Sequence, residues 1–200
     1  FDKEDLILKT DLDLVDRIWK DRPVLPHTST FHFEKQYAGK TMVEKIAAVR
    51  DILSADHLMI TKVDQVAWLF NLRAHDIPSF PVAMAYAIVS QDKASIYIDD
   101  SRLDATSREL FAKNHVTIRP YDAIYTDVQT LTGTVSVDPY TINSTLYRFI
   151  EADIEEEENP IELMKACKNE VEIEQTKHAH LKDAIAMTQF MYWLKTNVGK

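Results

Sequence analysis

The chain has a single cysteine and no basic stripe, and these two absences exclude several classes of protein. One cysteine, Cys167, in 200 residues excludes an internal disulfide framework and is typical of a reducing compartment. A net charge of -9 argues against a nucleic-acid backbone as the main partner. The sequence also lacks a signal peptide and an apolar run of about eighteen residues, so we expect a soluble, cytoplasmic protein.

Short catalytic motifs are absent as well. The sequence contains no HExxH, no CxxC and no glycine-rich phosphate loop. Cys167 has no nucleophile motif around it and is interpreted as a small apolar residue. His178 and His180 are two positions apart on a predicted helix, so their side chains point about 200° apart and are interpreted as exposed rather than as metal ligands.

Residues 58–89 carry the strongest structural pattern. Residues 58–60 form a short apolar run that predicts a buried strand, and Asp64 is expected to cap a short amphipathic helix that follows. Pro78 and Pro81 bracket a stiff extended link. The apolar run 82–89 then predicts a second strand that is buried on both faces.

Short strands and helices alternate along the rest of the chain. Strands are predicted at residues 6–8, 94–98, 116–118, 135–137 and, at a sheet edge, 160–166, and helices at residues 12–19, 41–53, 104–113, 121–131, 141–150 and 170–194. Residues 91–93 form a turn, which makes one strand pair antiparallel. This order predicts an α/β fold in three layers, with a mixed sheet of five or six strands.

Acidic residues have different roles in two segments of the chain, a helix start at residues 41–44 and a glutamate run at residues 155–158. Thr41 and Glu44 have the spacing of a capping box at the start of a helix. Residues 155–158 are four consecutive glutamates, which we interpret as a solvated, mobile loop. A metal site in this run is the alternative, but adjacent side chains in a loop lack an ordered ligand spacing.

The last predicted helix is apolar over more than one face, chiefly between residues 184 and 194. Such a helix is normally buried, yet the chain stops at Lys200. We therefore expect it to belong to a further domain that continues past Lys200. Docking on the α/β body and self-association are the alternatives. Because the chain starts at Phe1 without a methionine, we also expect upstream residues, and the segment 12–19 to pack on the domain that follows or on a missing one.

The sequence DQVAWLFNLRAHDIPSFPVAMAYAIV, at residues 64–89, resembles the middle domain of the three-domain Xaa-Pro aminopeptidases, also called aminopeptidase P. This family typically has an [ED]-[IV]-A-W-L-[FL]-N-L-R-G-x-D-[IV] block, from which the chain departs at Ala74 and His75. The segment LVDRIWKDRP at residues 14–23 resembles the exit from the first domain. The segment EIEQTKHAHLKDAIAMTQFMYWL, at residues 172–194, resembles the first helix of the catalytic domain.

The resemblance implies a creatinase N-terminal-like domain with a ribonuclease H-like layout. It implies that residues 1–36 end the first domain, residues 37–166 form the middle domain, and residues 167–200 begin the catalytic domain. Family members hydrolyse the bond before a penultimate proline with two divalent metal ions, expected to be manganese, held by two Asp, one His and two Glu. No position here matches those ligands, so we expect neither a catalytic metal nor peptidase activity in these residues.

The resemblance also implies partners and an architectural role. The expected partners are peptides with proline in second position, the chain's own catalytic domain and, since family members are often dimers, a second copy. The middle domain would then border the catalytic cleft. Candidate cleft-facing, substrate-binding residues are Arg73, His75, Asp76 and Tyr86, with Arg73 first because it is predicted to end a helix. A structural bridge from Arg73 to Asp76 or to helix carbonyl groups is the alternative.

Two other functions remain open at this point. The chain could be a stand-alone, creatinase-like protein-binding module without peptidase activity. It could also be a ribonuclease H-like nuclease that binds a divalent cation through Asp99, Asp100 and Asp104. The acidic charge argues against the nuclease, and these aspartates more often cap the next helix and form the turn.

Overall fold

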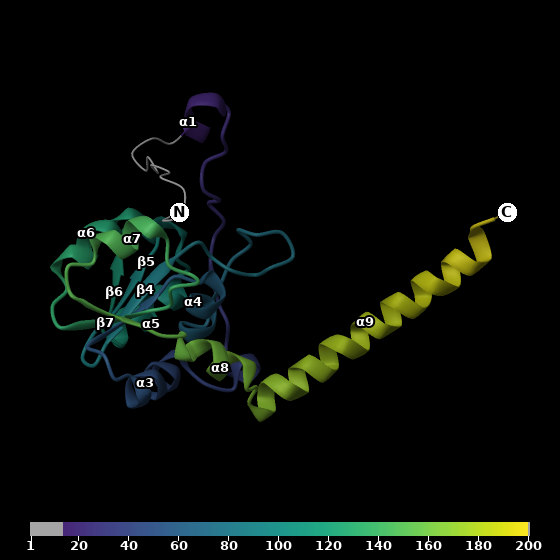
Figure 1. Ribbon diagram of the computed structural model, residues 1–200. Coiled ribbons are helices and arrows are strands. Elements are labelled where there is room, and N and C mark those ends of the chain that lie inside the picture. The colour runs from purple at the N-terminus through teal and green to yellow at the C-terminus, as the bar shows by residue number, and fades with distance from the viewer. Residues whose placement is uncertain (1–13, 200) are drawn as a thin grey trace, which may run out of the picture.

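A mixed six-stranded sheet lies at the centre of the structure, a computed structural model that describes residues 14–199 (Figure 1). In spatial order the strands are β6 (Val116–Arg119), β5 (Ala94–Tyr97), β4 (Tyr86–Ser90), β2 (His57–Ile60), β7 (Thr134–Val137) and β8 (Asp153–Glu156). Strand β4 runs antiparallel to both neighbours, and the other adjacent pairs are parallel. The predicted mixed sheet is therefore confirmed.

Helices cover both faces of this sheet. The helical elements are α1 (Leu14–Ile18), α2 (Lys35–Ala38), α3 (Met42–Ile52), α4 (Val63–Leu69), η1 (Asp100–Arg102), α5 (Ala105–Lys113), η2 (Tyr121–Ala123), α6 (Ile124–Asp127), η3 (Val128–Thr130), α7 (Ser144–Phe149), α8 (Pro160–Ala166) and α9 (Glu170–Asn197). Side chains of α3, α4, α5 and α8 share one hydrophobic core with the sheet, and those of α6 and α7 share the other. The predicted three-layer α/β fold is therefore confirmed. A separate antiparallel pair is formed by β1 (Phe31–His32) and β3 (Leu72–Arg73).

The alternation of side chains along the central strands builds these two cores. In β2, Leu58 and Ile60 lie in the core beneath α3 and α4, whereas Met59 lies in the core beneath α6 and α7. Successive strand residues point to opposite faces, so a strand that is buried on both sides must be apolar throughout. The predicted buried strand at residues 58–60 is confirmed.

The capping box of α3 is present as predicted. The Thr41 side chain accepts a hydrogen bond from the Glu44 amide (3.2 Å), and the Glu44 carboxylate accepts one from the Thr41 amide (2.6 Å). The bond from the Thr41 amide, together with that from Lys35, lowers the pKa of Glu44 to about 2. Two donors that the helix leaves without partners are satisfied in this way.

Two predictions for the segment that precedes α9 are wrong. Residues 160–166 form α8 instead of an edge strand, because Asn159 accepts a hydrogen bond from the Ile161 amide (3.0 Å) and Pro160 occupies the first helical turn. The predicted glutamate loop begins inside a strand, since β8 includes Glu155 and Glu156 and pairs in parallel with β7. As an edge strand, β8 leaves its charged side chains in solvent.

Other element boundaries also differ from the prediction. The N-cap of α4 is Lys62 instead of Asp64, which forms an ion pair with Lys165. The strand predicted at residues 82–89 begins only at Tyr86, because the Met84 amide donates to the Asp76 carboxylate (2.7 Å) instead of to a neighbouring strand. The helix predicted at residues 121–131 is split into η2, α6 and η3.

The two ends of the described chain extend away from the α/β domain (Figure 1). Ile18 of α1 is 81% exposed and Trp19 is 46% exposed, so packing of this segment on the following domain is not observed. Helix α9 projects outward, and its apolar side chains from Leu181 to Trp193 remain about half exposed or more. Docking of α9 on the α/β body, one of the alternatives, is therefore wrong for these residues. The strand predicted at residues 6–8 lies outside the described residues.

Candidate functional site

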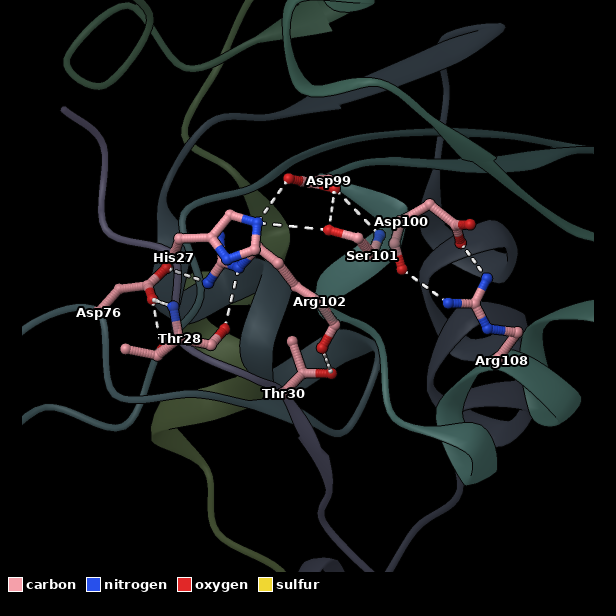
Figure 2. Close-up of polar contacts among 9 residues, drawn as sticks. All are labelled: His27, Thr28, Thr30, Asp76, Asp99, Asp100, Ser101, Arg102 and Arg108. Carbon is pink, nitrogen blue, oxygen red and sulfur yellow. Dashed lines mark hydrogen bonds and ion pairs between the residues drawn. The ribbon is translucent and has the colours of Figure 1, made fainter.

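Asp76 is the centre of a buried polar network that joins three segments of the chain (Figure 2). Its carboxylate accepts hydrogen bonds from the Thr28 hydroxyl (2.6 Å) and the Met84 amide (2.7 Å), and it forms an ion pair with Arg102. The side chains of Asp76 and Arg102 are 0% and 4% exposed. Burial raises the pKa of Asp76, but the bonds from Thr28, Met84 and Arg102 outweigh it and lower the pKa below its usual value.

Arg102 and Thr30 attach residues 27–30 to the domain. The Arg102 guanidinium donates to the Thr28 carbonyl oxygen (3.0 Å), and the Thr30 hydroxyl donates to the Arg102 carbonyl oxygen (3.1 Å). Sequence analysis assigned residues 1–36 to the end of the first domain and did not identify Arg102 or Thr28. Arg102 and Thr28 are 26 and 48 positions from Asp76 and 74 positions from each other, so local spacing carries no signal for these contacts.

Arg73 lies in β3, not at the end of a helix as predicted. Its guanidinium donates to the carbonyl oxygens of Ala67 and Leu72 (3.0 Å for Leu72) and lies 4.6 Å from the centre of the Phe33 ring. Burial lowers its pKa to about 10. The structure thus shows the helix-carbonyl contact of the alternative interpretation, while Asp76 pairs with Arg102 instead. The role of Arg73 towards a cleft stays a prediction.

His75 and Tyr86 have different environments from this network. The His75 side chain is exposed, and its ring centre lies 5.7 Å from that of Phe31. Tyr86 packs on the Tyr121 ring at 5.0 Å, in the core beneath α6 and α7. Burial and the hydrogen bond with Tyr121 raise the pKa of Tyr86 to about 12. The four predicted residues therefore do not form one cluster.

The three aspartates of the nuclease alternative act as caps and ion-pair partners, and Figure 2 shows the contacts of Asp99 and Asp100. Asp99 accepts from the Ser101 amide (3.0 Å) and contacts His27 (2.8 Å), and Asp104 caps α5 by accepting from the Ser107 amide (3.1 Å). Asp100 pairs with Arg108. These contacts are those of the capping interpretation, and they leave the nuclease hypothesis without a supporting arrangement.

Other candidate chemistry is sparse in the described residues. Cys167, which was interpreted as an apolar residue, is exposed, and so are His178 and His180. Between residues 14 and 199, no three His, Cys, Asp or Glu side chains are grouped so that they could hold a metal ion. No helix in this part of the chain is long and apolar enough to cross a membrane.

Lys45 is a buried cation that sequence analysis missed. It is 1% exposed, and its ammonium group donates to the Trp68 carbonyl oxygen (2.8 Å) and to Oδ1 of Asn71 (2.7 Å). The ammonium also lies 4.3 Å from the centre of the Trp68 ring. Burial lowers the pKa of Lys45 to about 7. Its spacing of three and four from buried Met42 and Val49 places it on the inner face of α3, a signal the sequence contained.

Comparison with known proteins gives consistent matches. The creatinase/prolidase N-terminal domain family matches residues 21–172. A protein of Laccaria bicolor that carries the name Probable Xaa-Pro aminopeptidase P is 34% identical over 199 residues, which cover 94% of this chain and 31% of that protein. A protein of the same name from Penicillium rubens is 32% identical, covering 93% and 33% respectively. The chain therefore spans about a third of the length of these curated relatives.

Solved structures agree with this assignment. The X-prolyl aminopeptidase of Caenorhabditis elegans, described as a cytosolic enzyme with a di-nuclear active site, is 29% identical to this chain with a TM-score of 0.86. The match covers 94% of this chain and 33% of that one. A Xaa-Pro dipeptidase from Bacillus anthracis, 15% identical with a TM-score of 0.54, shows the same fold over 76% of this chain and 44% of its own.

Proposed function

Because the chain belongs to the creatinase/prolidase N-terminal domain family, we propose that it is the non-catalytic middle domain of a Xaa-Pro aminopeptidase. Such an enzyme removes the N-terminal residue from peptides with proline in second position. The observation that carries this proposal is the coverage: relatives of that name match 94% of this chain but only 31% of their own length. The domain division proposed is residues 1–36, 37–166 and 167–200.

The metal chemistry is assigned to another part of such an enzyme. The C. elegans relative is described as having a di-nuclear active site, and we propose two divalent metal ions, manganese, in a domain that follows α9. The residues from 14 to 199 do not fit such a pair, because they contain no group of three or more His, Cys, Asp or Glu side chains suited to a metal ion. The hydrolytic step is therefore not assigned to residues of this domain.

The long helix supports a role in domain assembly. Seven large apolar side chains of α9 are 50–72% exposed, namely Leu181, Ile185, Met187, Phe190, Met191, Tyr192 and Trp193. An apolar surface of this extent is typical of an interface. We propose that the chain's own catalytic domain covers it, in the cytoplasm as for the cytosolic C. elegans relative, with a homodimer as a further assembly.

The deciding experiment compares two lengths of the same gene product. Hydrolysis of a peptide with proline in second position is measured with added manganese for residues 1–200 and for the chain extended to its natural C-terminus. We expect activity only in the extended protein, because the metal ligands are expected there. Activity of residues 1–200 alone would contradict the proposal. Inactivity of both proteins would favour the alternative, a creatinase-like protein-binding module.

His75 is the best residue for testing whether this region borders the substrate. Of Arg73, His75, Asp76 and Tyr86, it has the exposed side chain, so His75→Ala leaves no buried group without a partner. In the extended, active protein we expect this substitution to lower kcat/KM severalfold while the thermal midpoint stays unchanged. The matched control is His178→Ala, an exposed histidine on α9. Equal kinetics of the His75 variant and the unmodified enzyme would remove the cleft role.

A further inference from the structure

The direction of α9 is set by contacts at its first turns. Beyond these turns the helix projects away from the domain (Figure 1). Asn169, the N-cap of α9, donates to the Ala38 carbonyl oxygen (2.9 Å) at the end of α2. The fit is close: at Gly39, whose φ is 72°, an added Cβ would lie 2.2 Å from Oδ1 of Asn169. This junction therefore decides where the exposed part of α9 is presented.

Two cations, the buried Lys45 and the partly buried Arg73, lie behind the junction without a carboxylate in direct contact. Lys45 bonds to a carbonyl oxygen and an amide oxygen, and Arg73 bonds to two carbonyl oxygens. Within the described part of the chain, neither forms an ion pair closer than 4.0 Å. Buried charge of this kind is costly unless an opposite charge faces it.

Glu172, in the first turn of α9, supplies that opposite charge. One carboxylate oxygen accepts a hydrogen bond from Nε1 of Trp68 (3.3 Å), and the other accepts from the Asn169 amide (2.9 Å). The Lys45 ammonium lies over the same Trp68 ring. Burial lowers the pKa of both Lys45 and Arg73, and the charge of Glu172 opposes the shift at each.

We propose that Glu172 is a positioning residue whose carboxylate, held on Trp68 opposite the buried Lys45 and the partly buried Arg73, fixes the direction in which α9 leaves the α/β domain. Three residues of the WLFNLR sequence take part: Trp68 donates to Glu172, Asn71 accepts from Lys45, and the charge of Glu172 acts on Arg73. The direction of α9 does not depend on the proposed function. An effect of this direction on catalysis, through the placement of the following domain, does rest on the proposed function.

The variant Glu172→Gln separates charge from capping. Glutamine at this position keeps the capping-box hydrogen bond to the Asn169 amide but removes the negative charge. The matched control is Glu170→Gln, which removes one charge from the same helical turn at an exposed position. Both variants lose the same interaction with the helix dipole. A difference between them therefore reports the charge that faces Lys45 and Arg73 together with the hydrogen bond from Trp68, which the glutamine NH2 group cannot accept.

The orientation is measured as a distance distribution by pulsed electron paramagnetic resonance. Spin labels are attached through Asp92→Cys in the β4–β5 turn and Lys195→Cys near the end of α9, both exposed, in a Cys167→Ser background. We expect one narrow distribution for the unmodified chain and for Glu170→Gln, and a broadened, displaced one for Glu172→Gln. Identical distributions for the two glutamine variants would overturn the proposal.

The same pair in the extended protein tests the consequence for activity. If α9 leads into a catalytic domain, Glu172→Gln is expected to lower kcat about tenfold or more, because small misplacements of reacting groups are costly. Glu170→Gln is expected to leave kcat unchanged. A displaced helix with unchanged kcat supports the positioning role of Glu172 and contradicts only the link to catalysis.

Discussion

Replacing Asp76 with alanine is expected to lower the free energy of unfolding by about 3–5 kcal/mol, the usual cost of breaking a buried ion pair. Its side chain is fully buried and accepts hydrogen bonds from Thr28 and Met84 besides pairing with Arg102. The substitution leaves the Arg102 guanidinium, 4% exposed, without a counter-charge. It also removes the acceptor of the hydrogen bonds from the Thr28 hydroxyl and the Met84 amide. Urea unfolding at neutral pH measures the loss.

Asp100→Ala is the matched control for this substitution. Asp100 also pairs with an arginine, Arg108, but the two side chains are 57% and 43% exposed. Exposed pairs contribute little because water screens them, so a much smaller loss is expected. A double variant, Asp76→Ala with Arg102→Met, should be less destabilised than the two single losses added together, because no unpaired charge remains. If Asp76→Ala were as mild as Asp100→Ala, the network would not be holding the domain together.

The lowered pKa of Asp76 predicts that the free energy of unfolding decreases in acid. The folded pKa of Asp76 is lowered relative to its usual value, so its ionised form stabilises the fold at and above the unfolded pKa, about 3.9. That contribution is lost as the pH falls through the lower, folded pKa.

Replacing Lys45 with methionine is expected to remove a rise in stability between neutral and alkaline pH. The folded pKa of Lys45 is about 7, whereas an unfolded lysine titrates near about 10.4. Between these values the unfolded chain holds a proton that the folded chain has released. Stability therefore increases with pH, by up to about 1.4 kcal/mol per pH unit for one proton. Below pH 7 both states are protonated and the dependence ends.

Urea unfolding at pH 7.5 and 9.5 measures this effect. The unmodified chain should gain about 2–3 kcal/mol over this interval from Lys45 alone, a gain that Lys45→Met should lack. Lys93→Met, at an exposed lysine in the β4–β5 turn, is the control that should keep the gain. Groups such as Tyr86, whose pKa is raised to about 12, contribute equally to all three proteins and cancel in the comparison. An equal pH slope in the Lys45 and Lys93 variants would contradict the assignment.

Local signals predicted the elements that local interactions decide. The Thr41–Glu44 capping box and the strand at residues 58–60 depend on neighbours in the chain, and both are present. Residues 160–166 were misassigned because a short apolar run fits a buried strand and a helix equally well. The helix start at Asn159–Pro160 was the signal that distinguishes them.

The candidate site was predicted only as a set of residues, and the resemblance supplied that set. Arg73 and Asp76 were named together, but their partners are different: Arg73 bonds to helix carbonyl groups, and Asp76 pairs with Arg102. Lys45 went unnoticed because a lysine on a helix is normally exposed. Its partners Trp68 and Asn71 are 23 and 26 positions away, beyond any local pattern.

The amino-acid sequence by itself determined the family, the α/β class and the apolar character of the last helix, since each follows from residue order and hydrophobic spacing. The tertiary structure decided which charges face one another and where α9 points. Burial makes this difference: an ion pair such as Asp76–Arg102, or a cation such as Lys45, acquires its energy only once distant segments exclude water around it.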